Sequence, residues 1–301
     1  MATLRPERRD DRWERAIDAV DPVAGAHVIF GMLFDRVFPL DLLLAAELGQ
    51  LRTFAVPSIS RLLHATGQYE QEGQKRVDDT RAILAEIVVP GPTSVRGREM
   101  IAHLGEIHRH YRIANDDYLL TLAALAVSPI EHVDVWGHRP MRPHERAAWY
   151  EVIRQLGVEM KLSDVPPTYE AMVAFRSRYE ARAVRYDAAN EAVARALIDV
   201  LANTLPPPLR RLVAPTIALM LGAPHVVAAL GLRPPTTAER RLIETTLRAR
   251  AAIERRYTAY QHVGFSKSAL FTDLPSYPNG YQRHLLGPRR IIAKLLANRA
   301  G

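Results

Sequence analysis

The feature that most restricts the fold of this chain is the spacing of its apolar residues, which recur every three or four positions along most of its length. This period is that of an amphipathic α-helix, and no stretch alternates between apolar and polar residues long enough to predict a sheet. Pro and Gly fall at the joints between the periodic segments, where they interrupt helices. The spacing therefore predicts an all-α chain with helices over residues 24–47, 68–88, 97–113, 116–135, 143–161, 168–204, 209–221 and 236–258.

Three parts of the chain differ in character. Residues 1–23 form a charged N-terminal segment without the apolar stretch of a secretory signal. Residues 24–260 are predicted to form a single helical domain, a reasonable size for one core. Residues 261–301 are predicted to form an irregular tail that ends in a short basic helix. We expect a cytoplasmic protein, and its oligomeric state stays open.

The composition excludes several kinds of site and partner. The chain has no cysteine, so it cannot form disulfides, thiolate-bound haem, cysteine zinc sites or iron–sulfur clusters. Its net charge of +7 comes almost entirely from arginine. These arginines are interspersed with acids, and no basic run with interleaved aromatics or nucleic-acid motif is found. We therefore expect no nucleic-acid partner.

Two apolar stretches raise the question of a membrane. Residues 27–48 carry charged residues such as Asp35 and Glu47, and residues 212–232 are broken by Gly222 and Pro224. Buried helices or an apolar substrate channel are therefore favoured over membrane spans. The basic helix near the C-terminus would suit peripheral contact with anionic lipid, but a solvated helix end is the favoured explanation of its charge.

His108 is a candidate site residue because it falls on the apolar stripe of the predicted helix 97–113. Arg112 lies one turn further along, whereas His103 and His110 are predicted to point away from the stripe. A lone histidine on an apolar face is more often an ordinary buried residue than a ligand, and the pattern alone leaves both interpretations open. The stripe consists of Met100, Ile101, Leu104, His108 and Tyr111.

Arg76 and Thr80 form a second candidate pair, four residues apart along the edge of an apolar helix face. A guanidinium at such a boundary needs a polar or anionic partner, because a buried unpaired charge is costly. That partner is either an acid on a neighbouring helix or a group bound in a pocket. Neither this helix nor the helix that carries His108 decides between these alternatives.

Two other kinds of chemistry are weaker candidates. The carboxylate–histidine pairs of Glu99, His103, Glu106 and His110 could bind a non-haem metal, but such pairs are commonly surface contacts on a helix. Asp116 and Asp117 could act as acid and base, but their position after Ile113 predicts a role in capping the next helix.

Taken together, these segments resemble a known family. Arg76-x-x-Asp79-Thr80, then Ile107-His108-x-x-x-Arg112 and Asn115-Asp116-Asp117 follow the order and spacing of the rubber oxygenase catalytic-domain family. This family includes the latex-clearing proteins and the fungal mpaB-type oxygenases of meroterpenoid biosynthesis, and the mpaB branch is closer. The resemblance extends over about residues 50 to 290, through segments 128–130, 136–140, 166–170, 178–180, 277–281 and 286–287.

The resemblance implies a globin-like core that holds haem b, with His108 as axial iron ligand, Arg76 and Thr80 on the distal side and Arg112 near a propionate. It further implies an oxygenase that uses dioxygen on a small, apolar, isoprenoid-like alkene. The chain departs from the latex-clearing pattern at Ser60, where those enzymes have a glutamate base, and at Asp79, where they have lysine. Because Ser60 replaces the catalytic base, a second interpretation stays open: a non-catalytic helical protein that binds haem or a hydrophobic ligand. A haem peroxidase is an intermediate possibility between the oxygenase and this binder.

Overall fold

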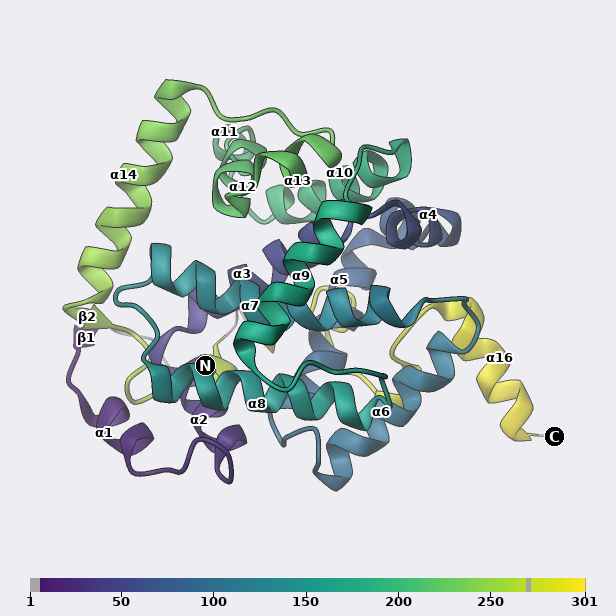
Figure 1. The fold of residues 1–301 in the computed structure, drawn as a ribbon, viewed down its shortest axis with the longest axis horizontal. Coiled ribbons are helices and arrows are strands. Elements are labelled where there is room, and N and C mark those ends of the chain that lie inside the picture. The colour runs from purple at the N-terminus through teal and green to yellow at the C-terminus, as the bar shows by residue number, and fades with distance from the viewer. Residues whose placement is uncertain (1–5, 269–271, 301) are drawn as a thin grey trace.

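The computed structural model describes residues 6–268 and 272–300, and within them the chain is almost entirely helical, as Figure 1 shows. The predicted all-α class is confirmed, whereas the globin-like form of the core stays a prediction. The elements in chain order are β1 Glu7–Arg8, α1 Arg12–Asp18, α2 Ala26–Met32, η1 Leu33–Val37, α3 Pro39–Thr53, α4 Pro57–Thr66, α5 Gln68–Val88, α6 Val95–His108, α7 Asn115–Trp136, α8 Pro143–Glu159, α9 Tyr169–Ala183, α10 Ala188–Asn203, α11 Pro207–Arg210, α12 Val213–Leu221, α13 Pro224–Ala229, α14 Thr237–Glu254, β2 Tyr257–Thr258, η2 Phe265–Lys267, η3 Arg283–Leu285 and α16 Arg289–Ala300.

The centre of the molecule is the pair α3 and α7, which pack along each other. α7 also packs against α8 and α9, and α8 packs against α2, so the largest hydrophobic cluster forms around α7. A second cluster joins α3 and α5 to α10, α12 and α13, which lie together at one end of the molecule (Figure 1). α14 runs along one side from this group to the two-residue antiparallel pair β1–β2.

Local sequence signals explain where many of the helices begin and end. Pro39, Pro57, Pro143 and Pro224 each stand in the first turn of a helix, where the missing amide hydrogen leaves no bond unmade. Gly222 adopts a φ of 62° at the end of α12, a conformation that favours glycine. The expected break within residues 212–232 is therefore confirmed.

Several predicted helix boundaries are wrong. The segment 24–47 is not one helix, because a π-helical turn and Pro39 divide it into α2, η1 and α3. The segment 168–204 is two helices, and the side chain of Asp187 caps the second by accepting a hydrogen bond from the Ala189 amide. The helix predicted over 97–113 ends at His108. The short helices α4 and α13 were not predicted.

α7 is long and apolar enough, by length and composition, to cross a membrane. However, 67% of its most apolar window is buried inside the protein, where it packs on α3, α8 and α9. The central helix of a folded domain has the same composition, so this feature alone is weak evidence for a span.

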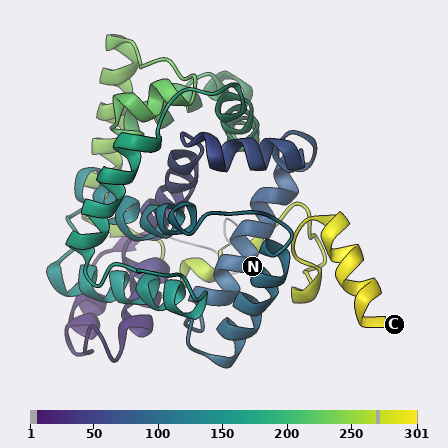
Figure 2. The ribbon, with the colours of Figure 1, turned by 45° about the vertical axis from the view of Figure 1, so that its right-hand side comes forward.

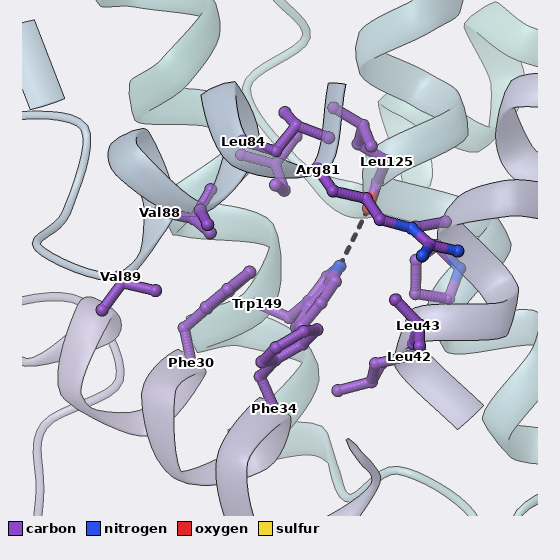
Figure 3. A pocket seen from close by; sticks show the side chains of 14 residues that line it. Phe30, Phe34, Leu42, Leu43, Arg81, Leu84, Val88, Val89, Leu125 and Trp149 are labelled. Atoms are coloured by element: carbon purple, nitrogen blue, oxygen red, sulfur yellow. Dashed lines mark hydrogen bonds between the residues drawn. The ribbon is translucent and has the colours of Figure 1, made fainter. Parts of the chain in front are cut away.

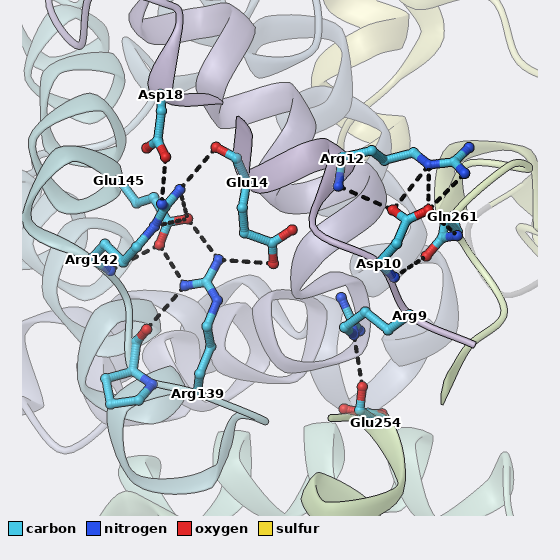
Figure 4. Close-up of polar contacts among 11 residues, drawn as sticks. Arg9, Asp10, Arg12, Glu14, Asp18, Arg139, Arg142, Glu145, Glu254 and Gln261 are labelled. Atoms are coloured by element: carbon cyan, nitrogen blue, oxygen red, sulfur yellow. Dashed lines mark hydrogen bonds and ion pairs between the residues drawn. The ribbon is translucent and has the colours of Figure 1, made fainter. Parts of the chain in front are cut away.

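Both ends of the chain are attached to the body, the N-terminal segment by polar contacts, several of which Figure 4 shows. The Arg9 Nε donates to the Glu254 carbonyl at 2.7 Å, and Arg139 bridges Glu14 and the fully buried Glu145. At the other end, α16 lies at the edge of the molecule (Figure 2) and packs Ile291 and Ile292 against α6. The described segment before α16 contacts α5, where the Ser276 amide donates to the Asp78 side chain at 2.8 Å.

Asp79, which replaces the lysine of the latex-clearing pattern, takes part in this attachment of the tail. Its carboxylate accepts hydrogen bonds from Lys75 and from the Tyr277 hydroxyl, and Lys75 also donates to the Gly287 carbonyl at 2.8 Å. Asp79 is buried by these contacts. The aspartate that replaces the lysine of the latex-clearing pattern thus helps α5 to bind the C-terminal tail.

His138 makes the stability of the fold depend on pH. Its side chain is buried against Phe38, and within the described chain neither ring nitrogen has a hydrogen-bond partner. Burial, followed by the nearby charges of Arg9 and Arg139, lowers the pKa of His138 to about 3. Between the ordinary histidine pKa of about 6.5 and this value the unfolded chain binds more protons, so stability falls as the pH falls.

We expect wild-type protein to lose about 2 kcal/mol of unfolding free energy from this histidine between pH 8 and pH 5. A His138→Phe variant should lack that part of the loss, because it removes the titrating group and no hydrogen bond. Urea unfolding at several pH values measures the difference, and His284→Phe, at an exposed histidine, is the matched control. Equal pH dependence in all three proteins would contradict the assignment.

Candidate functional site

A cavity of about 280 Å³ lies between α3, α4, α5, α6 and α7, beside the predicted site residues. Arg76 and Thr80 line it from α5, His108 lines it from the last position of α6, and Arg112 lines it from the loop that follows. All four residues named from the sequence therefore lie on one cavity. Most of the other wall residues are apolar, among them Leu62, Leu104 and Ile113.

His108 is held as a neutral imidazole. Burial, followed by the positive charge of Arg76, lowers its pKa to about 4, so the ring carries no charge at neutral pH. Its ring lies 5.3 Å from that of Tyr118, centroid to centroid. Among the residues that the structure describes, neither ring nitrogen accepts or donates a hydrogen bond. A neutral histidine without a hydrogen-bond partner is free to bind a metal through a ring nitrogen.

Arg76 does not form the salt bridge that the sequence leaves open. No carboxylate of the described chain pairs with it. Its guanidinium lies 5.3 Å from the centre of the Tyr69 ring and donates to the Thr80 hydroxyl, which in turn donates to the Arg76 carbonyl at 2.8 Å. A cation in a mainly apolar cavity, without an acid beside it, is suited to meet an electron-rich ligand.

Arg112 is not on the helix that carries His108, so the prediction that they lie one helical turn apart is wrong. After His108 the backbone closes tight turns, in which the His110 and Tyr111 amides donate to the Ile107 and His108 carbonyls. Arg112 follows these turns, is exposed and lines the cavity, so it lies where the cavity meets solvent.

His103 is not the surface residue that a carboxylate–histidine pair on a helix would suggest. His103 is buried and its Nε2 lies 2.8 Å from the Leu286 carbonyl, because the C-terminal tail covers this side of α6. His110 is exposed as expected, and Glu99 pairs with Arg283. Within the described ranges no three His, Asp or Glu side chains come together to hold a metal, so the non-haem site considered from the sequence is not formed by these pairs.

The Asn115–Asp117 segment does not cap α7 with a side chain. Ala114 occupies the N-cap position, and residues 115–117 form the first turn of the helix. Asp117 is buried, and its Oδ1 accepts hydrogen bonds from the Ser58 hydroxyl at 2.9 Å and from the Tyr179 hydroxyl at 2.6 Å. It lines the cavity, so an acid that the sequence assigns to capping in fact faces the candidate site.

Ser60 does not face the cavity. Its side chain is completely buried between α4 and α10, where its hydroxyl bonds to the Asn190 side chain. The acid that the sequence analysis missed is Glu47 on α3, which lines the cavity and pairs with Arg81 at 2.9 Å. Burial raises the pKa of Glu47 above its ordinary value. The sequence does contain a sign of this role: Glu47 lies inside the apolar run of residues 42–51, and acids are rarely buried without a specific partner or role.

Comparison with known proteins identifies the family of the chain. Residues 34–260, which include all four predicted residues, match the family described as ER-bound oxygenase mpaB/B'/Rubber oxygenase, catalytic domain. The chain is 30% identical over 187 residues to the ER-bound oxygenase mpaB of Penicillium roqueforti (strain FM164), a match that covers 56% of this chain and 63% of that protein. It is 32% identical over 132 residues to the ER-bound oxygenases mpaB and mpaB' of Penicillium brevicompactum, covering 42% of this chain and 34% and 31% of those proteins. The match thus spans less than two thirds of the length of each relative.

Proposed function

Because the chain belongs to the family of mpaB-type and rubber oxygenase catalytic domains, we propose that it is a haem b-dependent oxygenase that uses dioxygen to cleave an alkene in a small, apolar, isoprenoid-like substrate. Membership of this oxygenase family confirms the resemblance and makes the chain an oxidoreductase by family. The observation that most supports the finer proposal is the convergence of Arg76, Thr80, His108 and Arg112 on one cavity.

The donor set of the cavity fits a haem. A haem brings four nitrogen ligands of its own, so one protein histidine is sufficient to hold its iron. His108 fits this role because it is neutral, lines the cavity and has no competing hydrogen bond among the described residues. Arg112, at the mouth of the cavity, is placed to pair with a propionate, since guanidinium and carboxylate form two parallel hydrogen bonds. When bound, the haem would supply the iron at which dioxygen is activated.

Arg76 and Thr80 would act on the oxygen. Both side chains line a cavity of low polarity, where the positive charge of the guanidinium would stabilise developing negative charge more strongly than it does in water. The hydrogen bond between the two side chains fixes the Thr80 hydroxyl beside the guanidinium. Glu47, whose raised pKa suits a carboxyl group that exchanges protons, would take the proton-transfer role that the family pattern places at the position of Ser60.

The apolar walls and the surface of the protein define its partners. Side chains such as Leu62, Leu104 and Ile113 would select an apolar substrate and exclude water. The relatives are named ER-bound, and the exposed Arg289, Arg290 and Lys294 of α16 are suited to contact anionic lipid. These features support our proposal of a cytoplasmic protein with peripheral membrane contact, and we continue to expect no nucleic-acid partner.

The test is to express the full chain with haem supplied, record its absorption spectrum and iron content, and measure oxygen uptake with a panel of isoprenoid alkenes. We expect a strong Soret band and alkene-dependent oxygen uptake with carbonyl products. Protein that stays colourless in the presence of haem would refute the haem mechanism. Haem binding without uptake for any alkene would favour the non-catalytic binder, and turnover only with hydrogen peroxide would favour a peroxidase.

A further inference from the structure

A second cavity, of about 100 Å³, lies beside the one that holds His108. The two cavities share five wall residues, so one layer of side chains separates them: Leu43, Ala46, Arg81, Leu84 and Leu125. We call the smaller one the apolar chamber. Figure 3 shows the rings of Phe30, Phe34 and Trp149 on one side of it, with Leu84, Arg81 and Leu125 on the other.

The polar groups around the apolar chamber are already engaged. The Trp149 Nε1 donates to the Leu125 carbonyl at 3.1 Å, and the Trp149 ring stacks on Phe30 with centroids 4.1 Å apart. Arg81, the charged residue of this wall, is paired with Glu47. A wall of this kind gives water few hydrogen bonds and favours hydrocarbon, and the chamber reaches the surface of the protein at the exposed Val89.

We propose that the apolar chamber receives the saturated end of the substrate, while its alkene lies in the cavity lined by Arg76 and His108. This inference rests on the proposed function, because it assigns the second half of the same site. The candidate catalytic groups lie on one cavity and the aromatic wall on the other, so a molecule with a reactive end and an inert end matches the pair. The side chains between the two cavities, which set the width of the passage that joins them, include those of Leu43, Leu84 and Leu125.

The size of the apolar chamber limits what it can hold. It is somewhat smaller than the cavity of ~150 Å³ that binds benzene in another protein, so it accommodates a hydrocarbon end of roughly four or five carbons. Each methylene buried there should improve affinity about fourfold. The chamber would therefore select substrates by the length of chain beyond the alkene.

The experiment measures, by calorimetry without dioxygen, the affinity of the purified full chain, supplied with haem, for linear alkenes of increasing chain length. The Ala85→Phe variant should fill the chamber, because Ala85 lines it and does not line the larger cavity. We expect affinity in wild type to rise about fourfold per methylene and then level off. In the variant the gain from the last four or so carbons should disappear, a loss of about 250-fold for long alkenes and little change for short ones.

Ala174→Phe is the matched control, since it makes the same change at an exposed position on α9. Identical chain-length profiles in wild type and Ala85→Phe would overturn the proposal. If Ala85→Phe does not fold, a crystal of wild type soaked with an alkene brominated at its saturated end gives the answer. Anomalous scattering beside Trp149 supports the chamber, and bromine elsewhere refutes it.

This test separates the chamber from the function on which it rests. Binding is measured without turnover, so a protein that takes up no haem and still shows the chain-length profile would refute the haem oxygenase and leave the chamber standing. A haem protein that cleaves alkenes but binds them with no dependence on chain length would support the haem oxygenase and refute the chamber.

Discussion

Replacing His108 by alanine is expected to abolish stable haem binding and, with it, oxygenase activity. The purified His108→Ala protein should lack the Soret band of wild type, because the described part of the cavity offers no second neutral histidine to bind the iron. His108 lies at the end of α6 and makes no hydrogen bond to a described residue, so the substitution should leave the fold and its melting temperature little changed. Absorption spectra and circular dichroism measure the two effects separately.

The matched control is His110→Ala. His110 lies two positions further along and is exposed, and its Nδ1 lies 3.0 Å from the Glu106 carbonyl of its own turn. This variant should keep the wild-type spectrum. Imidazole added to His108→Ala should enter the space left by the side chain and restore part of the Soret band. A wild-type spectrum in His108→Ala would show that another residue binds the iron.

The second large effect is expected at Arg76. Arg76→Gln should lower kcat/KM for the alkene by about 10²–10³, with haem content unchanged, because it removes a charge that stabilises the reacting oxygen. The loss should fall mainly on kcat, since the guanidinium is assigned to the oxygen and the substrate is held by apolar walls. Steady-state oxygen uptake at several alkene concentrations measures both constants.

Arg112→Gln is the control for charge. It removes the same charge from the wall of the same cavity, but Arg112 is exposed, so solvent screens its effect and we expect a loss of no more than about tenfold. Equal losses in the two variants would contradict a specific role for Arg76. Loss of haem from Arg76→Gln would instead make Arg76 a residue that holds the cofactor.

Local rules account for most of the helices and for the positions of the first candidates. Periodicity predicts α5, α7, α8 and α14 to within a few residues, because each has an apolar face and a clear terminus. The segments predicted as single helices over 24–47 and 168–204 fail where a π-helical turn and a capping aspartate interrupt a continuous apolar pattern. Periodicity detects the face of a helix and is insensitive to a short break in it.

The sequence by itself determined the all-α class, from the spacing of apolar residues, and the family, from the order of its motifs. It also named Arg76, Thr80, His108 and Arg112 as candidates, because they match the family's motifs. Only the tertiary structure decided which other residues share their cavity. Glu47 and Asp117 face it, and Ser60 does not, because the packing of α3, α4 and α7 orients them. The tail buries His103, and the apolar chamber forms where α2, α5 and α8 meet. Contacts between segments far apart in the chain leave no periodic signal in either segment, so they emerge only when the helices are packed.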